Sequence, residues 1–280
     1  MKTKSQGAKT SVYILLTVLA IIFLAPVFII LLNSFKTSLY ISEKPFSFPS
    51  GESYAGFQNF IKGFTQSDFS RAFLNSLFIT VFSVAGIVLL TSMAAWYIVR
   101  VKNKFTKAMY YLLIFSMIVP FQMVMYTMTY FAFELNLNNL IGTVLIYLGF
   151  GAGLSVFLFS GFIKSIPAEI EEAATIDGCS PVKTFFLVIF PILKPTSITV
   201  AILNAMWIWN DYLLPYLLLG SGKSRTLPVA VQMALTGGYG NKDMGALMAM
   251  LVLAILPIII FYLFCQKYII KGVVAGAVKG

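Results

Sequence analysis

Long apolar runs separated by short polar segments dominate the chain. A helix that crosses the hydrocarbon core of a membrane needs about 20 mostly apolar residues. Six stretches reach that length: 12–32, 72–99, 108–133, one within 135–163 that starts at Leu140, 195–219 and 244–266. The pattern predicts an all-α polytopic membrane protein with six transmembrane helices. Pro26 predicts a kink in the first helix and Pro120 a mild break in the third.

Composition supports a membrane protein and excludes a water-soluble globule. Of the 280 residues, 59% are hydrophobic and 11% are charged, and the mean hydropathy is +0.88. Soluble domains carry about 25% charged residues. The net charge of +10 would suggest nucleic acid in a soluble protein. In a membrane protein, basic residues gather on the cytoplasmic loops instead.

The distribution of basic residues predicts the orientation of the spans. The N-terminal segment and every second loop after it hold 13 Lys and Arg, and the intervening loops hold 7. This excess predicts that both termini are cytoplasmic. We therefore divide the chain into four parts: a cytoplasmic segment with the first span (1–33), an extracellular loop (34–71), a five-span core with a long inner loop at 164–194 (72–266) and a cytoplasmic tail (267–280).

The side chains that support most catalytic and metal chemistry are scarce. The sequence has no His, and its two cysteines, Cys179 and Cys265, are too far apart for a metal knuckle. The string 220–224 (GSGKS) lacks the first glycine of a phosphate-binding loop, because Leu217 stands there. We therefore expect no catalytic site, metal or cofactor in this chain.

The loop 164–194 contains signals for two short helices. Ser165 is a suitable N-cap and Gly178 a suitable residue after the last turn, which predicts a helix of about three turns. Ser180 begins a second helix that Pro191 ends. The apolar side of the first helix would consist of Ile166, Ile170, Ala173 and Ala174. These features fit a solvated connector as well as a docking helix.

The segment 166–178 (IPAEIEEAATIDG) resembles the EAA loop of permease subunits of binding-protein-dependent ABC importers. In that family the loop forms a coupling helix that docks in a cleft of the cytoplasmic ATPase. The resemblance assigns ATPase coupling to Glu171, Glu172, Ala173, Ala174, Asp177 and Gly178. The charge distribution independently places this loop in the cytoplasm.

Four further segments resemble the carbohydrate-uptake branch of the family, in particular its maltose-permease-G-like subunit. They are 119–122 (VPFQ), 209–212 (WNDY), 226–229 (TLPV) and 271–280 (KGVVAGAVKG). The sequence departs from its relatives at Asp211, where they often carry Glu. The resemblance implies the type I permease fold of ABC importers, a second homologous permease as heterodimer partner, and two ATPase subunits that hold ATP and Mg. It also implies an extracellular solute-binding protein and a sugar substrate.

Several polar and aromatic residues within the spans are candidates for the translocation path. An acid inside a span is costly, so Asp211 should face other helices or a wet cavity rather than lipid. The candidate residues are Gln122, Tyr126, Trp207, Asn210 and Asp211. The alternative for Asp211 is that it pairs with a group on a neighbouring span and only fixes packing.

Other functions remain as alternatives, each with missing features. An ion-coupled secondary transporter would need inverted repeats and several charges within the membrane. An integral-membrane enzyme would need a catalytic set. An ABC permease for another solute, such as an amino acid or a metal, is the nearest alternative, and the carbohydrate-branch matches at 209–212 and 271–280 speak against it. We also predict that the glycine-rich tail 272–280 cannot fold alone and packs against the ATPase.

Overall fold

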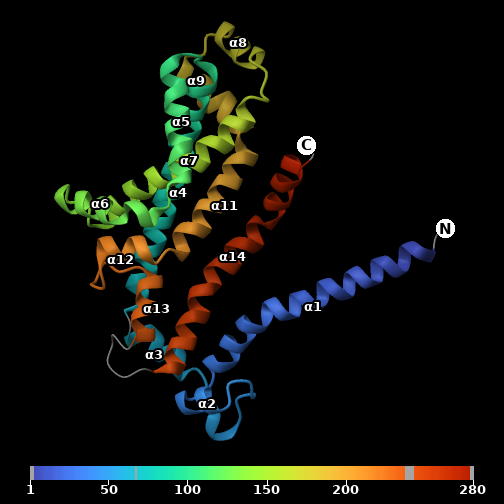
Figure 1. Ribbon diagram of the computed structural model, residues 1–280, viewed down its shortest axis with the longest axis vertical. Coiled ribbons are helices and arrows are strands. Elements are labelled where there is room, and N and C mark those ends of the chain that lie inside the picture. Colours follow the sequence, from blue (N-terminus) through green and yellow to red (C-terminus); the bar gives the residue numbers. More distant parts are fainter. Residues whose placement is uncertain (1–2, 67, 237–242, 278–280) are drawn as a thin grey trace. The chain divides into compact units, whose positions relative to one another are not determined.

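The computed structural model describes residues 3–66, 68–236 and 243–277, and this part of the chain is almost entirely helical (Figure 1). The helices are α1 (Thr3–Ser34), α2 (Ser38–Glu43), η1 (Gly51–Ser53), α3 (Gln58–Gln66), α4 (Phe69–Arg100), α5 (Lys104–Ile118), α6 (Phe121–Glu134), α7 (Leu140–Ile163), α8 (Glu169–Ile176), α9 (Pro181–Thr184), η2 (Phe185–Ile189), α10 (Phe190–Ile192), α11 (Lys194–Asn210), α12 (Leu213–Leu219), α13 (Leu227–Thr236) and α14 (Met244–Ala277). The described residues form no strand. The predicted all-α class is confirmed.

Four helical segments are long and apolar enough to cross a membrane without interruption: Lys9–Ser34, Phe69–Arg100, Leu140–Ile163 and Met244–Gln266. Two further pairs of helices qualify only as bent spans. They are Lys104–Ile118 with Phe121–Glu134, and Pro181–Ile192 with Lys194–Asn210. The described chain therefore has up to 6 spans, in agreement with the predicted number, if each bent pair crosses as one.

The break at Pro120 is much sharper than the mild one predicted. The helices on its two sides, α5 and α6, are bent by 108°. Val119 has an extended backbone, with φ −78° and ψ 114°. A residue before proline is driven out of the helical region by the proline ring, so both Val119 and Pro120 leave the helix and the chain changes direction.

The predicted fifth span, 195–219, is divided at Asp211. Helix α11 ends at Asn210, Asp211 is extended with ψ 123°, and α12 begins at Leu213. The Asp211 carboxylate accepts a hydrogen bond from the Leu213 N–H. An Asp side chain that bonds nearby backbone in this way competes with the helix. On the other side, α11 follows the segment Pro181–Ile192 at an angle of 76°.

The chain forms two compact units, and the larger comprises Arg71–Val229 with Ile258–Gly280. Its central helix is α7, which packs against both α5 and α11. A Cβ atom at Gly153 would lie 2.6 Å from the Leu113 carbonyl oxygen of α5. Gly153 thus permits the close approach of α7 and α5, whereas Gly149 faces open space.

The smaller unit comprises Met1–Ser70 with Ala230–Pro257. Buried polar side chains hold the segment between α1 and α3 in place. Asn59 donates to the carbonyl oxygens of Ser34 (2.9 Å) and Lys36 (2.7 Å). Lys36 is fully buried, and its ammonium group donates to the carbonyls of Lys44 (2.9 Å) and Pro45 (3.2 Å). Burial lowers the pKa of Lys36 from its ordinary value.

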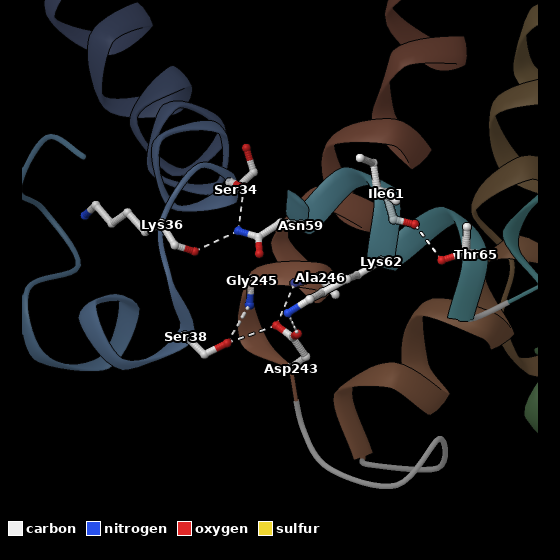
Figure 2. A network of polar contacts seen from close by, with 10 residues as sticks. All are labelled: Ser34, Lys36, Ser38, Asn59, Ile61, Lys62, Thr65, Asp243, Gly245 and Ala246. Carbon is white, nitrogen blue, oxygen red and sulfur yellow. Dashed lines mark hydrogen bonds and ion pairs between the residues drawn. The ribbon is translucent and has the colours of Figure 1, made fainter. Parts of the chain in front are cut away.

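Asp243 connects the first turn of α14 to the rest of the smaller unit (Figure 2). Its carboxylate accepts hydrogen bonds from the Ala246 N–H (3.0 Å) and the Ser38 hydroxyl (2.9 Å) and forms an ion pair with Lys62 (3.1 Å). The bond to Ala246 is that of an N-cap residue. A single carboxylate thus joins α2, α3 and α14.

The C-terminal segment is a continuation of the last helix as far as the structure describes it. Helix α14 continues through the end of its apolar run as far as Ala277, and residues 278–280 lie outside the described part of the chain. Extending an existing helix avoids the cost of nucleating a new one. A glycine-rich segment can therefore be helical without a fold of its own.

Candidate coupling loop and substrate path

Helix α8, which contains the EAA-like segment, begins later than predicted. Ser165 does not cap it, because both the Ser165 N–H (2.9 Å) and its hydroxyl (2.7 Å) bond to the Phe162 carbonyl at the end of α7. Ala168 takes the N-cap position without a side-chain hydrogen bond. The helix spans the 8 residues Glu169–Ile176, about two turns instead of three.

The C-terminal end of α8 is formed as the sequence predicts. Gly178 has φ +81°, a left-handed conformation that strains any residue with a Cβ atom. Its N–H donates to the Thr175 carbonyl (3.0 Å), and the Cys179 N–H donates to Ala174 (2.9 Å). These two bonds form a Schellman motif, so Gly178 is needed to turn the chain away from the helix.

Glu171 fixes α8 to the end of α4. Its carboxylate accepts from Arg100 Nε (2.7 Å) and Trp96 Nε1 (3.0 Å). Arg100 also donates to the Ile166 carbonyl (3.0 Å), before α8 begins. The Arg100 and Glu171 side chains are 23% and 14% exposed. This contact joins residues 71 positions apart. Its only indication in the sequence is indirect: the single Arg at the end of an uncharged run.

The six predicted coupling residues fall into two groups. Ala174 is buried and Glu171 faces Arg100, whereas Glu172, Ala173, Asp177 and Gly178 are exposed. Ile176 was not among the predicted residues, yet its side chain is 86% exposed. The expected apolar side is also divided, because Ile166 and Ala174 are buried while Ile170 and Ala173 are exposed. The outer surface of α8 therefore combines acidic and small residues with one protruding isoleucine.

Asp211 lies between helices, at the break between α11 and α12. Its carboxylate accepts a hydrogen bond from the hydroxyl of Tyr147 in α7 (2.9 Å) and from the N–H groups of Leu213 (3.0 Å) and Leu214 (3.4 Å). Tyr147 is fully buried. Tyr147 is thus the partner on a neighbouring span that the packing alternative for Asp211 requires. In the sequence, the only indication of this role is a polar group within a very apolar span.

The other candidate path residues are exposed but not all adjacent. Trp207 is 41% exposed, and its ring lies 5.4 Å from that of Tyr147 at an interplanar angle of 90°. Asn210 is exposed and donates to the Met206 carbonyl. Gln122 and Tyr126 are exposed on α6. Among the described residues, no hydrogen bond or ring contact joins them to Trp207 or Asn210.

The described part of the chain contains no group of three or more His, Cys, Asp or Glu side chains that could hold a metal ion. In the loop and at the break in the fifth span, single carboxylates hold helices against each other.

Comparison with proteins of known structure identifies the fold. The chain of a bacterial ABC transporter involved in the import of the acidic polysaccharide alginate superposes with a TM-score of 0.78 at 21% identity, and the match covers 96% of this chain and 98% of that one. The similarity shows the type I permease fold of ABC importers.

Comparison with curated sequences gives relatives over nearly the whole length. A probable permease for starch degradation products, AmyC of Thermoanaerobacterium thermosulfurigenes, is 40% identical, with 94% of each chain covered. A multiple sugar-binding transport permease, MsmG of Streptococcus mutans, is 38% identical, with 95% of this chain and 96% of the relative covered. The melibiose, raffinose and stachyose import permease MelC of Bacillus subtilis is 35% identical, with 100% and 99% covered.

Residues 87–274 match the family described as the inner membrane component of binding-protein-dependent transport systems. The matched region includes α8, the break at Asp211 and most of the membrane helices. The chain is a multi-pass membrane protein that belongs to this family of binding-protein-dependent transport components.

Proposed function

We propose that this chain is one permease subunit of an ATP-driven importer for a sugar or oligosaccharide delivered by an extracellular binding protein. The support for a sugar substrate is that three relatives between 35% and 40% identical carry names of sugar or oligosaccharide permeases. The observation that carries the permease role is α8: a short helix held to α4 by Glu171, with its outer surface uncovered. ATP and Mg would bind to a separate ATPase dimer, and a second homologous permease would complete the membrane part.

The proposed orientation has both termini in the cytoplasm. The 13 Lys and Arg of the N-terminal segment and alternate loops, against 7 elsewhere, support it. In this orientation α8 would lie on the cytoplasmic side, where an ATPase subunit can reach it. The loop around Asp243 then lies outside, on the side from which the binding protein approaches.

The exposed residues of α8 would make the ATPase contact. We assign docking to Glu172, Ala173, Ile176, Asp177 and Gly178, which are all exposed. Glu171 and Ala174 would act as positioning residues, because they face the permease itself. When ATP draws the two ATPase subunits together, the displacement of α8 would pass through the Glu171–Arg100 pair to α4, a helix of 32 residues.

The substrate path would use the exposed polar and aromatic groups of the spans. Trp207 and Asn210 at the end of α11, with Gln122 and Tyr126 on α6, offer ring faces and amide groups suited to sugar hydroxyls. Asp211 has its carboxylate occupied by three donors. We therefore assign it the role of holding the α11–α12 break in place beside this path.

The test of coupling is a carboxylate introduced on the docking surface of α8 in the assembled transporter. Gly178→Glu, alone or with Ala173→Glu, should insert normally but reduce ATPase recovery in a pull-down and sugar uptake at least ten-fold. An unpaired carboxylate buried against the ATPase costs several kcal/mol. The pull-down measures docking, and uptake of a panel of sugars measures both coupling and substrate class.

Two control variants separate charge from strain. Gly178→Ala introduces only the strain of a Cβ atom at φ +81°, and Ser224→Glu adds a carboxylate at an exposed position in another loop. Gly178→Ala should reduce uptake less than Gly178→Glu, and Ser224→Glu should not reduce it. Wild-type ATPase recovery and uptake in Gly178→Glu would contradict the coupling role.

A further inference from the structure

A pocket of about 550 Å³ opens at the ends of α4, α5 and α7, apart from the coupling helix and the substrate path. Four of its lining residues are lysines, Lys102, Lys104, Lys107 and Lys164, and none is acidic. All four are exposed, and no ion pair among the described residues involves any of them. The pocket therefore has a concentrated positive charge that the described residues do not neutralise.

A buried hydroxyl also lines this pocket. Ser160 of α7 has no exposed surface, and its Oγ has no hydrogen-bond partner. A buried polar group without a partner costs free energy, so most such groups are satisfied by protein, water or a ligand. An occupant with acceptor oxygens would satisfy Ser160 and the lysines together.

The apolar residues of the pocket indicate what kind of anion it fits. Ile98 and Val99, from the last turns of the membrane helix α4, and Tyr110 of α5 also line it. The Lys164 ammonium lies 5.4 Å from the centroid of the Tyr110 ring, which holds this cation over an aromatic face. The pocket thus has positive charge on one side and apolar side chains of a membrane helix on the other. This combination suits a molecule that is anionic at one end and apolar beyond it.

We propose that this pocket binds the headgroup of an anionic phospholipid, with the phosphate among the four lysines and Ser160. Basic pockets between membrane helices bind such headgroups in other membrane proteins. An acidic segment of a partner protein would use the lysines but would leave Ile98 and Val99 without a suitable partner. Because Arg100 follows these two residues directly, a bound lipid would also hold the end of α4 to which α8 is attached.

The experiment measures lipid retained by the purified permease–ATPase complex. The complex is incubated with phosphatidylglycerol or phosphatidylcholine in detergent, and bound lipids are counted by native mass spectrometry. The number of phosphatidylglycerol molecules that the wild-type complex retains should exceed the number of phosphatidylcholine molecules by at least one. Lys107→Gln with Lys164→Gln should reduce phosphatidylglycerol retention at least five-fold and leave phosphatidylcholine unchanged.

A matched variant with the same loss of charge is the control. Lys183→Gln with Lys194→Gln removes two exposed lysines of loop 164–194 that do not line the pocket, and it should retain phosphatidylglycerol as the wild type does. Equal loss of lipid in both double variants would contradict the proposed site, because the lower net charge alone would then explain the loss.

Two further outcomes would reveal a different occupant. If the wild-type complex retains no more phosphatidylglycerol than phosphatidylcholine but binds glycerol phosphate, and Lys107→Gln with Lys164→Gln abolishes that binding, the site takes small phosphates and the proposal fails. If Lys107→Gln with Lys164→Gln lowers ATPase recovery while lipid retention is unchanged, the lysines face an acidic surface of the ATPase instead. These readouts are independent of sugar uptake, so they do not depend on the proposed substrate.

Discussion

Two carboxylates, Glu171 and Asp211, do similar mechanical work in different ways. Each lies where a helix begins or breaks, and each attaches that point to a long uninterrupted helix. Glu171 attaches α8 to α4 through the charged Arg100 and the indole of Trp96. Asp211 attaches the α11–α12 break to α7 through the hydroxyl of Tyr147 and two backbone N–H groups.

The difference follows from the donors available at each place. Glu171 lies in α8, outside the spans, and its Arg100 partner remains 23% exposed, so the cation keeps part of its hydration. Asp211 follows directly on a membrane helix, where a second ionic group would itself have to be desolvated. Three neutral donors stabilise the carboxylate there without that cost. Only 11% of the residues are charged, so a carboxylate that accepts several hydrogen bonds is a strong local attachment between helices.

Breaking the charged pair should give the largest effect. Glu171→Ala leaves Arg100 without its ionic partner, and only its bond to the Ile166 carbonyl remains. We expect this to destabilise the attachment of α8 by about 2 kcal/mol, less than for a fully buried pair, because both side chains are partly exposed. Sugar uptake should fall at least ten-fold at unchanged membrane level. Release of α8 can be measured directly as faster maleimide labelling of Cys179, which is half-buried just after the helix, in a Cys265→Ser background.

Glu169→Ala is the matched control, since it removes an exposed carboxylate from the first turn of the same helix. It should change neither uptake nor the labelling rate by more than about two-fold. If Glu171→Ala labels Cys179 at the wild-type rate, the ion pair does not hold α8.

Changes at Asp211 should reduce sugar uptake less than loss of the Glu171–Arg100 pair, and should act through stability. Asp211→Leu removes the acceptor of a buried tyrosine hydroxyl and of two N–H groups, and unsatisfied buried donors cost about 1–3 kcal/mol. Asp211→Asn keeps an acceptor oxygen at nearly the same volume and should be close to the wild type. The midpoint of thermal unfolding in detergent measures both variants.

Tyr147→Phe provides the second half of a double-mutant cycle. Because Tyr147 and Asp211 share a hydrogen bond, the loss in the double variant should be smaller than the sum of the two single losses. Uptake then tests the substrate path: a stable Asp211→Asn protein with much reduced uptake would indicate that the carboxylate contacts the sugar, contrary to the positioning role.

Asp243 extends the comparison to a more exposed carboxylate and should give the smallest effect. Burial alone would raise the pKa of its carboxyl, but hydrogen bonds from Ala246, Lys62 and Ser38 outweigh burial and hold the pKa below 3.8. Because the folded pKa is lowered, the stabilisation is fully present above the ordinary value and is lost as the pH falls through the folded pKa. Asp243→Ala should cost about 1 kcal/mol at neutral pH, as for other N-caps.

The pH dependence separates the capping role from a simple packing effect. The difference in unfolding midpoint between Asp243→Ala and the wild type should be constant from pH 7 to pH 5 and shrink below pH 3.8, the ordinary pKa of the group. Lys62→Met, which removes only the half-exposed ion pair, should have a smaller effect. A difference that stays constant down to the lowest accessible pH would contradict the proposed cap.

Local signals in the sequence determined the features that depend on neighbouring residues alone. The apolar runs predicted the spans and the start of α7 at Leu140, because a helix in lipid must satisfy its own backbone within a continuous apolar stretch. The glycine after the EAA-like segment predicted the turn at Gly178, since only glycine takes φ +81° without strain. The motif in 166–178 pointed to the family that the comparisons then showed.

Tertiary structure decided every feature that depends on a distant partner. The sequence contained Arg100 and Tyr147 without indicating that they bind Glu171 and Asp211, which are 71 and 64 positions away. It indicated a break at Pro120 but not its angle of 108°. On the two sides of the break, α5 packs against α7 and α6 against α12, so distant partners determine the angle. A polar group in an apolar chain must find a donor or an acceptor, but only the packing of the helices determines which one lies within reach.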